Sequence, residues 1–166
     1  MKLYIIRHGI AAERTEYARD EDRPLTPEGD RKTTKVAKQL HKMQIHFDLI
    51  LTSPLIRAKQ TAKILQQEGL SDQLEKSAHL APAGDINDWL KWLEPWREKG
   101  GSSLAIVGHQ PNLGNWAEIL LWGQATQSLV VKKAGIIGLT LPQLGSPIAR
   151  SELFWLTPPK LFLSDL

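Results

Sequence analysis

The sequence predicts an α/β fold: a three-layer sandwich with a mostly parallel central sheet, an antiparallel edge and helices on both faces. Up to Gly123, short apolar runs of strand length alternate with longer segments of helical periodicity. After Gly123, β-like segments follow one another without a helix, which is typical of antiparallel strands at the edge of a parallel sheet. The length of 166 residues, without repeat or linker, predicts a single domain over 1–166.

The composition narrows the classes of function. Hydrophobic residues make up 42% and charged residues 23%, which is ordinary for a globular protein, and the net charge is +3. Acidic and basic residues are interleaved, so the chain lacks the basic stripe of a nucleic-acid-binding protein. The absence of cysteine excludes disulfide and thiol chemistry. No apolar run spans a bilayer and residues 1–9 lack signal-peptide features, so we expect a cytoplasmic protein without nucleic-acid or membrane partners.

Two local signals indicate strands and helices in the first half of the chain. The apolar run 3–6 ends at Arg7, His8 and Gly9. Thr26 and Pro27 have the residue types of an N-cap and a first helical position. We therefore expect strands over 3–6 and 47–52, a long loop with one helical turn over 10–25, and helices from Thr26 to about Met43 and from Pro54 through Leu65.

The second half continues the alternation and then departs from it. Asp85 is a plausible N-cap for a helix over 86–96, in which tryptophans at helical spacing indicate packing rather than a stacking platform. Gly100 and Gly101 end that helix. We further expect a strand near 75–80, a strand over 103–107, a helix through 116–122, β segments over 129–131, 135–141 and 152–156, and an irregular tail over 157–166.

Two strands are each predicted to end in a histidine. Arg7 and His8 follow the first strand, and Gly108 and His109 follow the strand over 103–107. The carboxyl ends of parallel strands form the edge at which open α/β sheets bind ligands. Arg57 lies in the first turn of the helix after Pro54, where a cation opposes the helix dipole. It either binds an anion together with free backbone N–H groups or is an exposed arginine paired with a neighbouring acid.

The chemistry of these four side chains favours an anion site. Arginine binds phosphate bidentately and stays charged, and neutral imidazole is a competent nucleophile. A metal is the rival use of paired histidines, but two arginines would repel it and no cysteine or carboxylate lies nearby in the sequence. We therefore predict a site for phosphate or sulfate at Arg7, His8, Arg57 and His109, with neither a metal nor another cofactor.

The ordered motifs resemble those of the histidine phosphatase superfamily, the phosphoglycerate mutase-like proteins. The resemblance covers most of the chain, and the short length together with residues 80–85 looks most like its SixA-type phosphohistidine phosphatases. It implies that His8 is the nucleophile, that Arg7 and Arg57 hold the phosphoryl oxygens, and that His109 donates to the phosphoryl group. The motifs are Arg7-His8-Gly9, Leu25-Thr26-Pro27-Glu28-Gly29, Thr52 to Thr61, and Val107-Gly108-His109-Gln110-Pro111.

One departure from the family pattern bears on the substrate. Larger members place a general-acid carboxylate at a position that falls near His79 here, with Asp85 the nearest acid. His79 or Asp85 could supply the proton, or Asp85 could serve only as an N-cap. An alkoxide leaving group needs such an acid, whereas the imidazole of a phosphohistidine leaves as a neutral ring once its far nitrogen is protonated.

These features predict a metal-independent phosphohistidine protein phosphatase. Little chain is available for a lid, so we expect an open site and a phosphorylated protein as substrate, such as a histidine-containing phosphotransfer domain of two-component signal transduction. The alternatives are a small-molecule phosphomonoesterase of the same superfamily and a phosphoprotein-binding domain without turnover.

Overall fold

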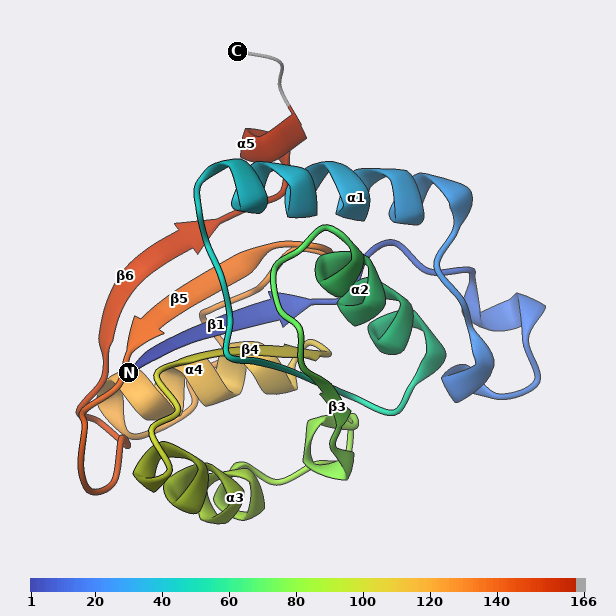
Figure 1. Cartoon of the computed structure of the whole chain (residues 1–166). Helices are drawn as coiled ribbons and strands as arrows, with labels where there is room; N and C mark the ends of the chain where they lie inside the picture. The colour runs from blue at the N-terminus through green and yellow to red at the C-terminus, as the bar shows by residue number, and fades with distance from the viewer. Residues whose placement is uncertain (164–166) are drawn as a thin grey trace.

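The computed structural model describes residues 1–163, and residues 164–166 lie outside the described part. One mixed sheet has the strand order β3-β2-β4-β1-β5-β6 (Figure 1). The strands are β1 (Lys2–Arg7), β2 (Leu49–Thr52), β3 (Leu74–Lys76), β4 (Ser103–Gly108), β5 (Ile136–Thr140) and β6 (Glu152–Thr157). The helices are α1 (Pro27–Lys42), α2 (Ile56–Gln67), α3 (Ile86–Glu98), α4 (Asn112–Trp122) and α5 (Lys160–Leu163), with short 3₁₀ turns η1 (Arg14–Glu16), η2 (Asp20–Asp22) and η3 (Ala78–Leu80).

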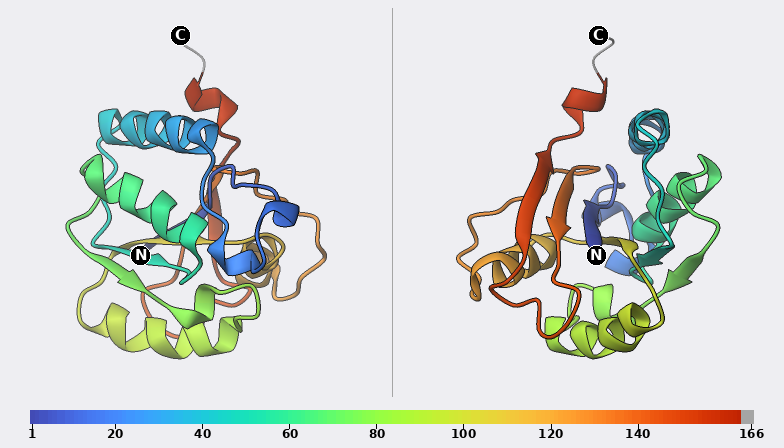
Figure 2. Two further views of the ribbon diagram at one scale, coloured as in Figure 1. Left: turned by 90° about the vertical axis from the view of Figure 1, so that its right-hand side faces the viewer. Right: turned by 60° about the vertical axis from the view of Figure 1, so that its left-hand side comes forward.

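Four neighbouring strands of the sheet run parallel. Strand β4 pairs in parallel with both β1 and β2, and β2 pairs in parallel with β3. Strands β5 and β6 continue the sheet antiparallel on the other side of β1. The carboxyl ends of β1, β2 and β4 therefore lie side by side at one edge, toward the viewer in the left view of Figure 2.

Helices cover both faces of the sheet. One core cluster joins the side chains of α1 and α2 to one face, and the other joins α3 and α4 to the opposite face (Figures 1 and 2). Trp89 is fully buried in the second cluster and packs on Trp116 with ring centroids 5.4 Å apart, which confirms a packing role for it. The predicted three-layer sandwich with an antiparallel edge is confirmed.

The start of α1 fastens the long segment that follows β1. Thr26 caps the helix by accepting a hydrogen bond from the Gly29 N–H at 3.0 Å, as its sequence position predicts. Gly29 lies so close to this segment that a Cβ on it would come within 2.0 Å of the Ile10 carbonyl oxygen. The Thr26 N–H donates to that same oxygen at 2.9 Å. A glycine is thus needed where α1 and the 10–25 segment touch.

Several predicted boundaries are corrected. The segment 129–131 is not a strand, because side chains of α4 and of the loop before it bind the backbone groups that a β ladder would use. Helix α2 begins at Ile56, two residues after Pro54, and the strand expected near 75–80 is divided into β3 and η3. The tail predicted to be irregular forms α5, while its last residues 164–166 lie outside the described part.

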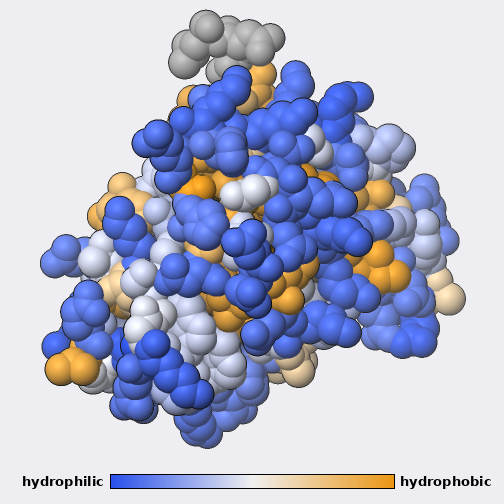
Figure 3. Space-filling view, in the orientation of Figure 1, coloured by the Kyte–Doolittle hydropathy of each residue, from blue (hydrophilic) through white to orange (hydrophobic). Residues whose placement is uncertain are grey.

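The outer surface over α1 and α2 is mostly hydrophilic (Figure 3). This agrees with α1, whose buried residues Thr33, Val36, Ala37 and Leu40 recur at helical spacing on one side. Among the described residues, no helix combines the length and apolar character that crossing a membrane would require.

The contact at Gly29 yields a prediction for stability. Gly29→Ala should lower the free energy of unfolding by roughly 1–3 kcal/mol, because the new methyl group meets a backbone oxygen that cannot rotate away. Urea denaturation measures the change. Lys35→Ala, at an exposed position of the same helix, is the matched control and should stay within about 0.5 kcal/mol of the parent. Equal stability of Gly29→Ala and the parent would contradict the contact.

Candidate active site

A pocket of about 280 Å³ opens at the carboxyl edge of the parallel strands. It brings together all four residues that the sequence predicted for the site, Arg7, His8, Arg57 and His109, although the first and last are 102 positions apart in the sequence. Five further residues line it: Asp20, Arg23, Pro82, Gln110 and Lys133. Two of these, Asp20 and Arg23, come from the 10–25 segment, so this segment lies over the end of β1.

Strand pairing places the two histidines beside each other. The ladder between β1 and β4 continues one residue beyond the strands, where the His8 N–H donates to the Gly108 carbonyl at 3.1 Å. Both imidazoles are buried, and their ring centroids are 5.2 Å apart. The same edge carries Ser53 at the end of β2, whose N–H donates to the Val107 carbonyl at 2.9 Å.

The protonation state of His8 follows from its contacts. Its Nδ1 lies 2.7 Å from the Gly9 carbonyl, which can only accept, so Nδ1 carries the proton. Its Nε2 accepts a hydrogen bond from Arg57 Nε at 3.3 Å. Burial, with smaller contributions from the charges of Arg57 and Arg7, lowers the pKa of His8 to about 3. At neutral pH, His8 is therefore uncharged, and its Nε2 lone pair faces Arg57.

His109 has one engaged and one unengaged nitrogen. Its Nε2 lies 2.7 Å from the Ser53 hydroxyl oxygen. Its Nδ1 is buried and has no hydrogen-bond partner among the described residues, and the same is true of Arg7 Nε. Burial first, then the charge of Arg57, lowers the pKa of His109 to about 4. Two unsatisfied buried nitrogens beside one pocket are what an incoming oxyanion would satisfy.

The position of Arg57 decides between the two alternatives left by the sequence. Arg57 is 3% exposed, so it is not a surface arginine, yet it does pair with an acid. Its two terminal nitrogens donate to the Asp20 carbonyl at 2.7 Å and to Asp20 Oδ2 at 2.8 Å. Asp20 thus binds the edge of the guanidinium formed by its two terminal nitrogens, while the edge that contains Nε faces His8. An oxyanion that bound this side of Arg57 would take the place of His8 as the acceptor of the Nε–H.

Asp20 is the functional candidate that the sequence analysis missed. Its carboxylate bridges Arg57 and Arg23, with Arg23 Nε at 2.9 Å. Burial by itself would raise the pKa of Asp20, but the hydrogen bonds and charges of Arg57 and then Arg23 hold it below its usual value. Asp20 lies in a segment of interleaved acidic and basic residues. That mixed charge was the only sign in the sequence of ion pairs in this segment.

The two residues considered as proton donors lie elsewhere. Asp85 is exposed and caps α3, where its side chain accepts from the Asn87 N–H at 2.6 Å. His79 is half-buried in η3, and neither residue lines the pocket. The only carboxyl among the described residues that line the pocket is Asp20. Nor do the described residues contain a cluster of three His, Cys, Asp or Glu side chains that could hold a metal ion.

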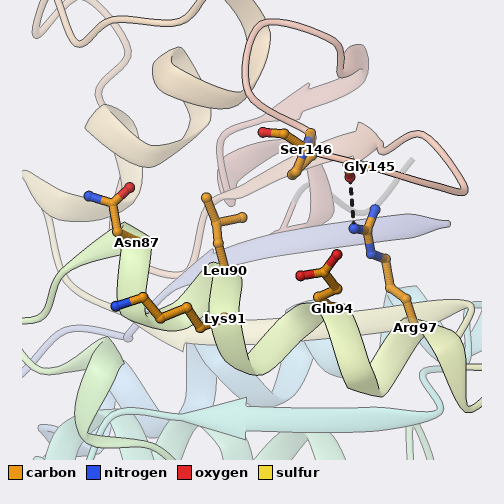
Figure 4. A pocket seen from close by; sticks show the side chains of 8 residues that line it. Asn87, Leu90, Lys91, Glu94, Arg97, Gly145 and Ser146 are labelled. Carbon is orange, nitrogen blue, oxygen red and sulfur yellow. Dashed lines mark hydrogen bonds between the residues drawn. The ribbon is translucent and has the colours of Figure 1, made fainter.

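A second cavity of about 240 Å³ lies between α3 and the β5–β6 loop (Figure 4). It contains an arginine, but Arg97 donates to the carbonyl oxygens of Pro142 and Gly145, each at 2.9 Å. This guanidinium connects a loop to a helix. The cavity therefore offers an oxyanion fewer free N–H donors than the pocket at the strand ends does.

Comparison with known proteins agrees with this geometry. The family model of the histidine phosphatase superfamily, branch 1, matches residues 3–109, which include every predicted site residue. The chain belongs to the histidine phosphatase superfamily. Membership of this family implies that the chain is a phosphatase. The chain also shares the phosphoglycerate mutase-like fold with its structural neighbours.

Individual relatives extend the comparison. An uncharacterised protein of Picosynechococcus is 48% identical over 98% of this chain and 99% of its own. The phosphohistidine phosphatase SixA of Escherichia coli K12 is 29% identical over 88% of this chain and 89% of its own. A solved structure of the protein histidine phosphatase SixA with tungstate covers 97% of this chain and 99% of its own, with a TM-score of 0.85 and 26% identity. A phosphoserine phosphatase of Entamoeba histolytica shares the fold, with a TM-score of 0.69, 17% identity, and coverage of 96% and 98%.

The buried imidazoles lead to a prediction about titration. In the folded histidine phosphatase, His8 and His109 should stay neutral on acidification until about pH 4 and below, because burial opposes their protonation. Imidazole ¹⁵N shifts, recorded from pH 8 to 4 and assigned with His8→Asn and His109→Asn, measure this. The unfolded chain in urea is the reference. Titration of His8 or His109 near pH 6.5 in the folded protein would contradict this prediction.

The same shifts set the direction of the pH dependence of stability. The unfolded chain takes up protons at both rings below about pH 6.5, and the folded chain does so only toward pH 4 and 3. The contribution of these two groups to stability is therefore complete above about pH 6.5 and decreases as the pH falls. His8→Asn and His109→Asn should each reduce the loss of unfolding free energy between pH 7 and pH 5.

Proposed function

We propose that this histidine phosphatase hydrolyses phosphohistidine in a partner protein, through a covalent phosphohistidine on His8. The observation that carries the proposal is the neutral His8 imidazole, with its Nε2 lone pair directed at a buried arginine in a pocket whose one carboxyl is held ionised. The similarity to SixA, whose name states this activity, supports it.

The proposed reaction has two balanced steps. His8 Nε2 attacks phosphorus, a new P–N bond forms, and the P–N bond of the substrate breaks. The leaving imidazole, protonated by solvent on its far nitrogen, departs as a neutral ring. Water then attacks phospho-His8, phosphate leaves, Nε2 regains its lone pair and a proton returns to solvent. Arg7, the Nε side of Arg57 and His109 Nδ1 surround the transferred group, which suits a reaction that depends on positioning and charge neutralisation.

Asp20 explains why a P–N bond suits this site better than a P–O bond. An ester needs a proton for its leaving oxygen, but two arginines hold the Asp20 carboxyl ionised and its oxygens engaged. A phosphohistidine ring obtains its proton from solvent before it leaves. The site therefore meets the needs of the easier leaving group without an acid of its own.

The surroundings of the pocket support a protein as the substrate. Pro82 and Lys133 line the pocket and are both exposed to solvent. Lys133 also borders a neighbouring recess of about 320 Å³, lined by apolar groups of Ile10, Ala134 and Pro159. An apolar side chain next to the phosphohistidine could occupy this recess, whereas a small metabolite would not reach it. A histidine-containing phosphotransfer domain of a two-component system is the partner class that we propose.

A small-molecule phosphomonoesterase is the second candidate, and the presence of Asp20 in the pocket is the observation that favours it. If a substrate drew Arg57 away from Asp20, the carboxyl could take up a proton and serve as a general acid. The two candidates therefore assign Asp20 different roles, which kinetics can separate.

The first prediction concerns His8. With ³²P-labelled substrate, the parent protein should carry acid-labile phosphate on His8, and His8→Asn should carry none while kcat falls at least about 10⁴-fold, because the nucleophile is gone. His46→Asn, at an exposed histidine outside the pocket, is the matched control and should keep full activity. Turnover by His8→Asn at the parent rate would refute the covalent mechanism.

The second prediction concerns the bond that is cleaved. We expect kcat/KM to fall from phosphohistidine protein to free phosphohistidine, and by a further factor of at least roughly 10² on phosphoserine or p-nitrophenyl phosphate, which need a general acid. Asp20→Asn should change P–N and P–O hydrolysis by similar factors. A loss of about 10²–10⁴-fold confined to the esters would identify Asp20 as an acid and the enzyme as an esterase.

A further inference from the structure

Helix α4 contains a buried acid that the proposed reaction does not use. Glu118 is completely buried, and the ion pairs among the described residues do not include it. Burying a carboxylate is costly unless hydrogen bonds replace its water. The partners of Glu118 are four successive backbone N–H groups of the loop after α4, together with one hydroxyl.

The contacts of Glu118 with this loop are close. Its Oε1 accepts from the N–H groups of Ser128 at 2.5 Å and Leu129 at 2.6 Å. Its Oε2 accepts from the N–H of Gln127 at 2.9 Å, and from both the N–H and the hydroxyl of Thr126. Burial would raise the pKa of Glu118, but these hydrogen bonds hold it below its usual value. Glu118 is thus an ionised anchor for a segment that has neither helix nor strand.

Two further residues, spaced four apart with Glu118, hold the same loop. A Cβ on Gly114 would lie 1.9 Å from the Leu129 carbonyl oxygen, so only glycine lets the loop approach the helix this closely. The Gln110 amide donates to that oxygen at 3.1 Å and accepts from the Val131 N–H at 3.3 Å. Gly114 and Glu118 lie one turn apart on α4, and Gln110 comes just before the helix. Together they fix the backbone from 126 to 131.

The far end of this loop meets the pocket. A terminal nitrogen of Arg7 donates to the Val131 carbonyl at 2.9 Å, which leaves Arg7 Nε buried and unpartnered beside the pocket. The Ala134 N–H reaches the carbonyls of Arg7 and His8 at 3.1 and 3.2 Å, and Lys133 lines the pocket. In the left view of Figure 2, this loop, in orange, lies at the same sheet edge as the segment after β1, in blue.

We propose that Glu118 is a positioning residue: by fixing the loop 126–131, it places the Val131 carbonyl that orients the Arg7 guanidinium toward the phosphoryl group. Glu118 does not line the pocket, so it acts through the loop, which the Val131 carbonyl connects to Arg7. The inference rests on the proposed function for the role of Arg7 as a phosphoryl ligand. A purely structural role would lower stability without any specific link to Arg7.

A double-mutant cycle on oxyanion binding tests the link. Glu118→Gln replaces one acceptor oxygen by an NH₂ group that faces N–H donors, so the loop should loosen. Tungstate affinity, measured by calorimetry, should fall roughly tenfold, the value of one charge-assisted hydrogen bond. In an Arg7→Ala background, the same substitution should change tungstate affinity less than twofold, because the group that Glu118 positions is absent. Equal losses in both backgrounds, or none in either, would overturn the proposal.

Two more variants complete the experiment. Asp48→Asn is the matched control: Asp48 Oδ2 also accepts backbone N–H groups, of Ser102 and Ser103 at 2.8 and 2.9 Å, but next to the amino end of β4, so tungstate affinity should stay unchanged. If Glu118→Gln does not fold, Thr126→Ala removes a single donor to Glu118 and should show a smaller loss with the same dependence on Arg7. Tungstate binding needs no turnover, so the positioning role can stand even if the P–N substrate is wrong.

Discussion

The parallel pairing of β4 with both β1 and β2 is the constraint on which the site depends. Because β4 lies between the other two strands, the residues that follow all three emerge at one edge in register. That register places His8 beside Gly108 and puts Ser53 within reach of His109. A shift of one residue in either pairing would turn these side chains to the opposite face. The core clusters on both faces therefore also hold the histidines in place.

Burial of the site determines the protonation of its groups. The two imidazoles are kept neutral because burial and the neighbouring guanidiniums both oppose a further positive charge. The arginines stay charged, and Asp20 provides Arg57 with a counter-charge on the side that faces away from His8. The result is a pair of neutral rings between fixed cations. His8 therefore keeps an unprotonated Nε2 at neutral pH, as the nucleophilic role that we propose for it requires.

The sequence predicted those parts of the fold in which a segment of clear strand or helix periodicity adjoins chemically distinctive residues. Runs of buried strand residues ending in Arg7-His8 and Gly108-His109 predicted the edge and its histidines, and Pro54 with Arg57 predicted a helix start facing them. The sequence could not show which backbone groups long-range side chains would bind. Residues 129–131 have the apolar content of a strand, but Gln110 and Glu118 bind their loop instead. Asp20 was missed for the same reason, since its partner Arg57 lies 37 positions further along the chain.

The ion pairs of Asp20 with Arg23 and Arg57 help to set the net charge of the pocket. Apart from Lys133 at the exposed edge, the pocket contains three guanidiniums and one carboxylate, and both imidazoles are uncharged at neutral pH. Two positive charges remain uncompensated, which equals the charge of a phosphoryl dianion. A bound dianion would offset these two charges and leave Lys133 as a further cation at the exposed edge. A ligand with one charge would leave one of the guanidinium charges uncompensated, so the charge of the pocket favours a dianion over a monoanion.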